Sequence, residues 1–115
     1  MQLRNVLELL SCELITGEEH LDRRFEHAFG SDLMSDVLAY VESDALLLTG
    51  LTNHQVIRTA EMLDLKAIVF IRGKRPNEEV IELARDHGLA LLSTKHTMYT
   101  ASGILYANGL EGIPV

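Results

Sequence analysis

Residues 70–97 read FIRGKRPNEEVIELARDHGLALLSTKHT. An apolar run ends in a glycine turn, an amphipathic segment follows, and a second apolar run leads to another polar turn. Pro76 stands where a helix can begin, and Glu78 and Glu79 complement its positive N-terminal end. Gly88 can supply the left-handed residue at which helices commonly end. The stretch therefore predicts a strand, a helix and a second strand.

The same alternation continues to both sides of this stretch. Apolar runs at 45–48, 66–71 and 89–92 predict buried strands. Strands without polar alternation are covered on both faces, and strand–helix–strand units with short turns form parallel crossovers. We therefore predict an α/β fold, a layered, mainly parallel sheet flanked by helices. The helices between and after the strands are expected to bury Val56, Ile57, Ala60 and Leu63, then Val80, Ile81 and Ala84, and from about 97 to 107 Met98, Ala101, Leu105 and Tyr106.

The first forty residues have a weaker pattern. Apolar residues at helical spacing predict a helix within the first ten residues, followed by a strand at 12–15. A polar segment from Thr16 leads to another strand. A helix is then expected from Ser31 or Asp32, with a side-chain oxygen capping it, to about Glu42. Its inner face is expected to hold Leu33, Val37, Leu38 and Val41.

Composition narrows the class of protein. The 115 residues, 47% of them hydrophobic, suit one domain spanning 1–115. A net charge of −7 argues against nucleic acid as a partner. No apolar stretch approaches the roughly 20 residues of a membrane span, and the N-terminus does not resemble a secretory signal, so we expect a cytoplasmic protein without a membrane partner. The single cysteine, Cys12, is interpreted as a buried free thiol, with a reactive or metal-binding role as the alternative.

Three loops follow the carboxyl ends of the expected parallel strands, where α/β sheets usually bind ligands. The middle loop concentrates basic residues beside a glycine and ahead of a helix N-terminus, which suits a phosphate or carboxylate group. The candidate ligand-binding residues are Thr49, Gly50, Thr52, Asn53, Arg72, Gly73, Lys74, Ser93, Thr94 and Thr97. The alternative is that Gly73 is only a turn residue, that the basic residues are a solvated patch and that the hydroxyl residues cap helices.

Catalytic and metal motifs are not evident. Gly73-Lys74 lacks the upstream glycine of a Walker P-loop, since Ile68 stands there, and no G-x-G-x-x-G follows a strand. The five histidines fall in separate segments. Asp22, Asp32 and Ser93 have no spacing that joins them to a base, and capping or solvated roles suit them. We therefore predict no catalytic residue, no metal site and no cofactor.

Two segments resemble a known family. LLSCELITGEEHLDRRF, residues 9–25, resembles the opening of the N-terminal domain of HPr kinase/phosphorylase, with its G-E-E and L-D-R. Residues 71–97 resemble the R-G-x-x-P-x-E-x-x-x-x-A stretch of the same domain. The same fold occurs in DRTGG domains, and the chain looks like a stand-alone DRTGG-type protein. By position, the D-R of that name corresponds to Leu51-Thr52 and the T-G-G to Arg72-Gly73-Lys74, so one glycine is retained.

The resemblance implies a regulatory or assembly module, and the kinase's catalytic domain is absent from this sequence. We expect a non-catalytic regulatory module that binds a small anionic metabolite or a nucleotide at the strand-end loops. The alternative is a domain for self-association or docking of a partner protein, through the acidic first half or the apolar tail at 109–115. A homodimer or a partner protein is expected in either case. A small enzyme is a third hypothesis, without a named reaction.

Overall fold

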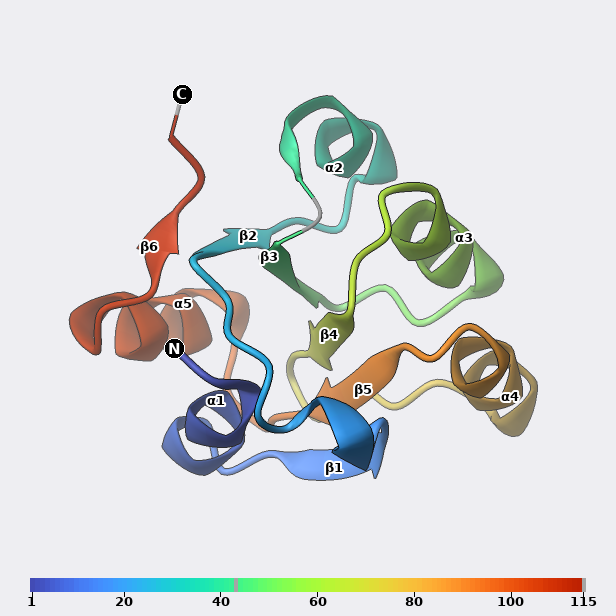
Figure 1. Cartoon of the computed structure of the whole chain (residues 1–115), viewed down its shortest axis with the longest axis horizontal. Helices are drawn as coiled ribbons and strands as arrows, with labels where there is room; N and C mark the ends of the chain where they lie inside the picture. The colour runs from blue at the N-terminus through green and yellow to red at the C-terminus, as the bar shows by residue number, and fades with distance from the viewer. Residues whose placement is uncertain (43, 115) are drawn as a thin grey trace.

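The computed structural model describes residues 1–42 and 44–114, which form one sheet with helices on both sides (Figure 1). The strands are β1 (Glu13–Thr16), β2 (His27–Gly30), β3 (Ala45–Thr49), β4 (Ala67–Phe70), β5 (Ala90–Ser93) and β6 (Glu111–Gly112). The helices are α1 (Leu3–Leu9), α2 (Met34–Tyr40), α3 (His54–Met62), α4 (Glu78–Asp86) and α5 (Met98–Ala107), with a 3-10 turn at Glu18–His20.

The sheet has the strand order β1-β5-β4-β3-β2-β6. Strands β2 to β6 pair in parallel, and β1 pairs with β5 antiparallel. The prediction of a layered, mainly parallel α/β sheet is therefore confirmed. Since β2, β3, β4 and β5 run side by side in the same direction, the loops that follow them emerge at one end of the sheet.

Two apolar clusters separate the layers. Leu47, Ile68 and Phe70 join the side chains of α2, α3 and α4 on one face. Leu46, Leu48 and Val69 join α1 and α5 on the other. Figure 1 shows this division, with α2, α3 and α4 on one side of the strands and α1 and α5 on the other. Burial on both faces explains why these strands are continuous apolar runs.

Local signals set the ends of the central helices. The side-chain oxygen of Asn53 accepts hydrogen bonds from the amides of Gln55 and Val56 at the start of α3. Asn77 caps α4 by accepting from Val80 at 3.0 Å. Gly88, beyond the end of α4, has a φ of +65°, so its predicted left-handed conformation is confirmed.

The predicted inner face of α2 is partly wrong. Leu33 precedes the first turn as the N-cap, without a side-chain cap, and Leu33 and Leu38 are 57% and 43% exposed. The Ser31 hydroxyl accepts the amide of Leu33, which keeps both residues in a turn before the helix. The helix therefore begins later than predicted, and its buried face contains Met34.

The C-terminal region differs from expectation in two places. Tyr106 is 66% exposed, because Ala101 and Leu105, four residues apart, already define the inner face of α5. The tail forms β6, an unexpected strand that pairs with β2, and Leu110 before it is 2% exposed. Val115 lies outside the described residues.

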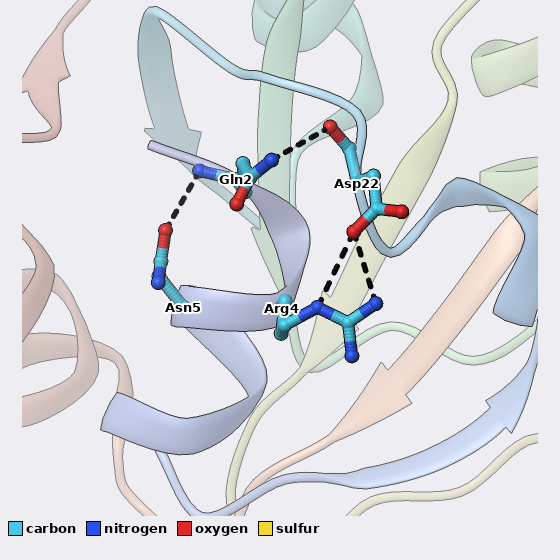
Figure 2. A network of polar contacts seen from close by, with 4 residues as sticks. All are labelled: Gln2, Arg4, Asn5 and Asp22. Atoms are coloured by element: carbon cyan, nitrogen blue, oxygen red, sulfur yellow. Dashed lines mark hydrogen bonds and ion pairs between the residues drawn. The ribbon is translucent and has the colours of Figure 1, made fainter.

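The N-terminal helix is tied to the segment that precedes β2 (Figure 2). The guanidinium of Arg4 donates to the Asp22 carboxylate at 2.9 Å, and the Gln2 side chain donates to the Asp22 carbonyl. The Gln2 amide donates to the Asn5 side chain. Asp22 of the L-D-R segment thus contributes to the attachment of α1.

Candidate functional site at the carboxyl ends of the parallel strands

The three loops selected from the sequence meet at one end of the sheet. The amide of Ile71 donates to the carbonyl of Thr49, which joins the loop after β4 to the end of β3. The amide of Arg72 donates to the carbonyl of His96 at 2.8 Å, which joins it to the loop after β5. The structure therefore brings the predicted loops into direct contact.

The middle loop turns through two left-handed residues, Arg72 with φ +56° and Gly73 with φ +68°. A left-handed arginine is uncommon and strained, because its Cβ crowds the following carbonyl oxygen. Both amides of this turn donate to the third loop, that of Arg72 to His96 and that of Gly73 to Thr94, each at 2.8 Å. These bonds hold the backbone of the turn while leaving the Arg72 side chain exposed.

The guanidinium of Arg72 lies over Gly50 in the first loop. A Cβ on Gly50 would stand 2.5 Å from an Arg72 guanidinium nitrogen and 3.5 Å from a carboxylate oxygen of Asp32. A glycine at this position therefore leaves the space that the guanidinium occupies. Among the described residues, no carboxylate forms an ion pair with Arg72.

The neighbouring basic residues differ in their contacts. The guanidinium of Arg75 pairs with Glu13 of β1. The Lys74 amine is exposed and has no ion-pair partner in residues 1–42 and 44–114. Arg72 and Lys74 are therefore the cations of this turn that remain available to an anion.

Three of the candidate hydroxyl groups bond within the protein. Thr49 donates to Asp32 at 3.0 Å, Ser93 to the carbonyl of Lys74 at 2.6 Å and Thr94 to the carbonyl of Leu10 at 2.7 Å. All three residues are buried. These bonds connect the loops to one another and to the end of α1. The three hydroxyl groups therefore hold the loops in place and do not face the solvent.

The remaining candidates lie nearer to solvent. Thr52 is half-buried, and Thr97 is exposed at the start of α5, where its hydroxyl donates to Thr100. Asn53 is exposed, although its side-chain oxygen caps α3. The amide nitrogen of Asn53 is the part of this side chain that can still donate to a ligand.

Asp32 belongs to the same constellation and was not among the candidates. One carboxylate oxygen accepts from the Thr49 hydroxyl and from the Gly50 amide at 2.6 Å. The sequence hint is that Asp32 follows β2 directly. The pairing of β2 with β3, which places Asp32 beside Gly50, joins strands connected through α2 and could not be read from residue types.

Two side chains with shifted pKa values, Cys12 and Asp64, lie outside these loops. Burial raises the pKa of the Cys12 thiol to about 12, which makes it a poor nucleophile, and Cys12 is half-buried. The Lys66 amine, by a hydrogen bond and by its charge, lowers the pKa of the exposed Asp64. No group of three or more His, Cys, Asp or Glu in residues 1–42 and 44–114 is arranged to hold a metal.

The fold and its loops define a class of protein: an α/β domain with a mainly parallel sheet, whose strand-end loops present cations and hydroxyl groups. The DRTGG domain model matches residues 5–107, and the chain belongs to the DRTGG domain family. A search of curated proteins finds no match. None of the helices in the described residues is long and apolar enough to cross a membrane.

A solved structure shares the fold. It contains the CBS and DRTGG domains of the regulatory region of Clostridium perfringens pyrophosphatase, complexed with the activator diadenosine tetraphosphate. The TM-score is 0.77 at 21% identity, over 99% of this chain and 48% of that chain. This chain thus spans about half the length of that relative.

Proposed function

We propose that this chain is a non-catalytic regulatory module that binds a small anionic metabolite, in particular a nucleotide, at the strand-end loops. The observation that carries the proposal is the exposed, left-handed Arg72, held over Gly50 at the meeting point of three loops. Strained residues that the surrounding structure keeps in place are concentrated at ligand sites. A guanidinium without an ion-pair partner suits phosphate or carboxylate oxygens, and Lys74 adds a second positive charge.

The position of Asp32 favours a nucleotide over an inorganic anion. Only one of its carboxylate oxygens has a hydrogen-bond donor among the described residues. The second oxygen can accept from a hydroxyl or an amino group. A nucleotide offers phosphate oxygens to Arg72 and sugar or base donors to Asp32, whereas inorganic phosphate at neutral pH gains less from a carboxylate. The activator in the related pyrophosphatase structure is also a nucleotide.

The proposed contacts are assigned by position in the site. Arg72 and Lys74 bind the anion, Gly50 and Gly73 allow close approach, and Thr52, Asn53 and Thr97 hydrogen-bond to the ligand. Thr49, Ser93 and Thr94 hold the loops in place. We further propose a single domain over 1–115, a cytoplasmic location and kinship with the N-terminal domain of HPr kinase/phosphorylase.

The test is ligand-dependent stabilisation, because a ligand that binds only the folded state raises its melting temperature. The ligands are AMP, ATP, diadenosine tetraphosphate, inorganic phosphate and citrate, each followed by thermal denaturation and by NMR shifts of the loop amides. A nucleotide should give a saturable rise in Tm. The absence of a shift with every ligand contradicts the proposal.

Matched variants locate the site. Gly50→Ala places a methyl group against the flexible end of Arg72, so it displaces the guanidinium without changing charge. Arg72→Gln removes the charge, and Arg75→Gln removes the neighbouring charge that pairs with Glu13. Gly50→Ala and Arg72→Gln should weaken binding about tenfold or more, since a charge-assisted hydrogen bond contributes about 1.5–3 kcal/mol, and Arg75→Gln should change it little. Equal losses in both arginine variants indicate binding by net charge alone.

A further inference from the structure

The exposed side of α5 differs from that of an ordinary surface helix. The helix reads MYTASGILYA and has no Asp, Glu, Lys or Arg, in a chain with 23% charged residues. Tyr99 and Tyr106 are 88% and 66% exposed, with exposed Ser102 and Gly103 between them. Large exposed aromatic rings without neighbouring charges are typical of contact surfaces. In Figure 1, α5 lies at the margin of the molecule, on the face opposite α2, α3 and α4.

These four exposed residues are arranged symmetrically along the helix. Tyr99 and Tyr106 lie equally far from the midpoint between Ser102 and Gly103, so each end of this face has an aromatic ring and its centre has two small residues. In an antiparallel pair of α5 helices related by a two-fold axis, each residue meets the residue of the partner subunit that mirrors it about this midpoint, so the tyrosines meet at both ends and the small residues meet at the centre. The face is therefore complementary to a second copy of itself.

We propose that α5 is the interface of a homodimer, in which two copies of α5 pack antiparallel about a two-fold axis near Ser102 and Gly103. Small residues at the crossing allow the helix axes to approach to about 8 Å, the lower end of the range for packed helices. Tyr99 of each subunit then packs against Tyr106 of the partner subunit, at both ends of the contact. Aromatic pairs of this kind are among the contacts that dominate interface energies.

Charge favours a second copy over a basic partner. The chain has a net charge of −7, so two copies repel each other over most of their surface. The repulsion is weakest at α5 itself, which has no Asp, Glu, Lys or Arg. A basic partner would instead be drawn to acidic surfaces such as that of α4, where Glu78, Glu79 and Glu82 are exposed.

The size of the surface sets the expected strength. Ten helical residues span about 15 Å, which is short for the roughly 800 Å² per partner that stable complexes bury. The dimer should therefore be weak and concentration-dependent. Neither Arg72 nor Lys74 lies on α5, so the dimer can be tested without the proposed ligand.

Gly103 offers a test that does not weaken the fold. A Cβ at this position meets no atom within 4 Å, and both Glu and Lys have a higher helix propensity than glycine. Gly103→Glu and Gly103→Lys each place two like charges at the two-fold axis. Met62→Glu is the matched control, because Met62 is 69% exposed on α3, on the opposite face of the sheet.

Sedimentation equilibrium from about 10 μM to 1 mM measures the association, a range chosen because weak complexes have a Kd near 1 mM to 1 μM. The wild type and Met62→Glu should dimerise equally, and each Gly103 variant should remain monomeric with a Tm no lower than that of the wild type. An equimolar mixture of Gly103→Glu and Gly103→Lys should restore a dimer, since opposite charges then meet at the axis. A monomeric wild type at 1 mM, or a dimer in either separate Gly103 variant, overturns the proposal.

Discussion

Gly17 and Gly73 both have left-handed backbone, with φ of +92° and +68°, and both lie in segments that carry the family resemblance. Their surroundings are opposite. A Cβ on Gly17 would stand 2.3 Å from the Cα of Ala90 in β5, whereas a Cβ on Gly73 would meet nothing within 4 Å. Gly17 is therefore required by packing against the sheet, while Gly73 is required only by the conformation of an exposed turn. The comparison separates a glycine that builds the fold from one that shapes a surface for binding.

The largest effect is expected from Gly17→Ala. The added methyl group is strained by about 1–2 kcal/mol at a left-handed φ, and it collides with backbone that cannot move aside cheaply. Overpacking of this kind costs about 1–3 kcal/mol, so the free energy of unfolding should fall by about 2–5 kcal/mol in urea denaturation. Gly103→Ala is the control, with open space and helical backbone, and it should be neutral or stabilising. A loss below about 1 kcal/mol, less than the overpacking cost alone, means that Gly17 does not touch β5 closely.

Thr94→Val tests how the turn at Gly73 is held. The Gly73 amide bonds to the carbonyl of Thr94, and the buried Thr94 hydroxyl donates to the carbonyl of Leu10. Valine keeps the shape but leaves that carbonyl without its donor, which costs about 1–3 kcal/mol. Calorimetry should show this loss. The exposed Thr100→Val should change the free energy of unfolding by no more than about 0.5 kcal/mol. Equal losses in both variants would contradict the role of Thr94 in linking the turn at Gly73 to the end of α1.

The segments around Gly17 and Gly73 also show which features of the structure could be predicted from the sequence. Burial on both faces made β3, β4 and β5 recognisable from apolar runs alone, and the loops after them could be located for the same reason. The packing of Gly17 on Ala90 joins residues far apart in the chain and leaves no local pattern. Likewise, Asp32 lies beside Gly50 because β2 pairs with β3. Arg72 lies over Gly50 because its side chain points toward the loop after β3. The positions of the loops were therefore predictable, but the contacts between them were not.

Gly73→Ala should have a smaller effect than Gly17→Ala. Only the backbone conformation opposes the methyl group, so the expected cost is about 1 kcal/mol, at the low end of the left-handed penalty. The difference between Gly73→Ala and Gly17→Ala, measured under the same conditions, gives the contribution of packing at Gly17. Equal losses of unfolding free energy at the two positions would mean that packing against β5 contributes nothing at Gly17. Because Gly73 is proposed to let the ligand approach the backbone, the exposed methyl group should also weaken nucleotide binding.

The smallest change in stability, and the one with the opposite sign, is expected from Arg72→Gly. Glycine relieves the left-handed strain of about 1–2 kcal/mol but adds freedom to the unfolded chain, which costs about 0.5–1 kcal/mol. The free energy of unfolding of the variant should therefore be about 0.5 kcal/mol higher than that of the wild type. Its nucleotide affinity should fall. Arg75→Ala, which loses an exposed ion pair with Glu13, should change stability by no more than about 0.5 kcal/mol and keep its affinity.

A stabilised variant that no longer binds means that strain at Arg72 is retained for ligand recognition. If Arg72→Gly instead loses stability, the contact of the guanidinium with Gly50 contributes more to the fold than the strain removes, and Arg72 has the same kind of structural role as Gly17.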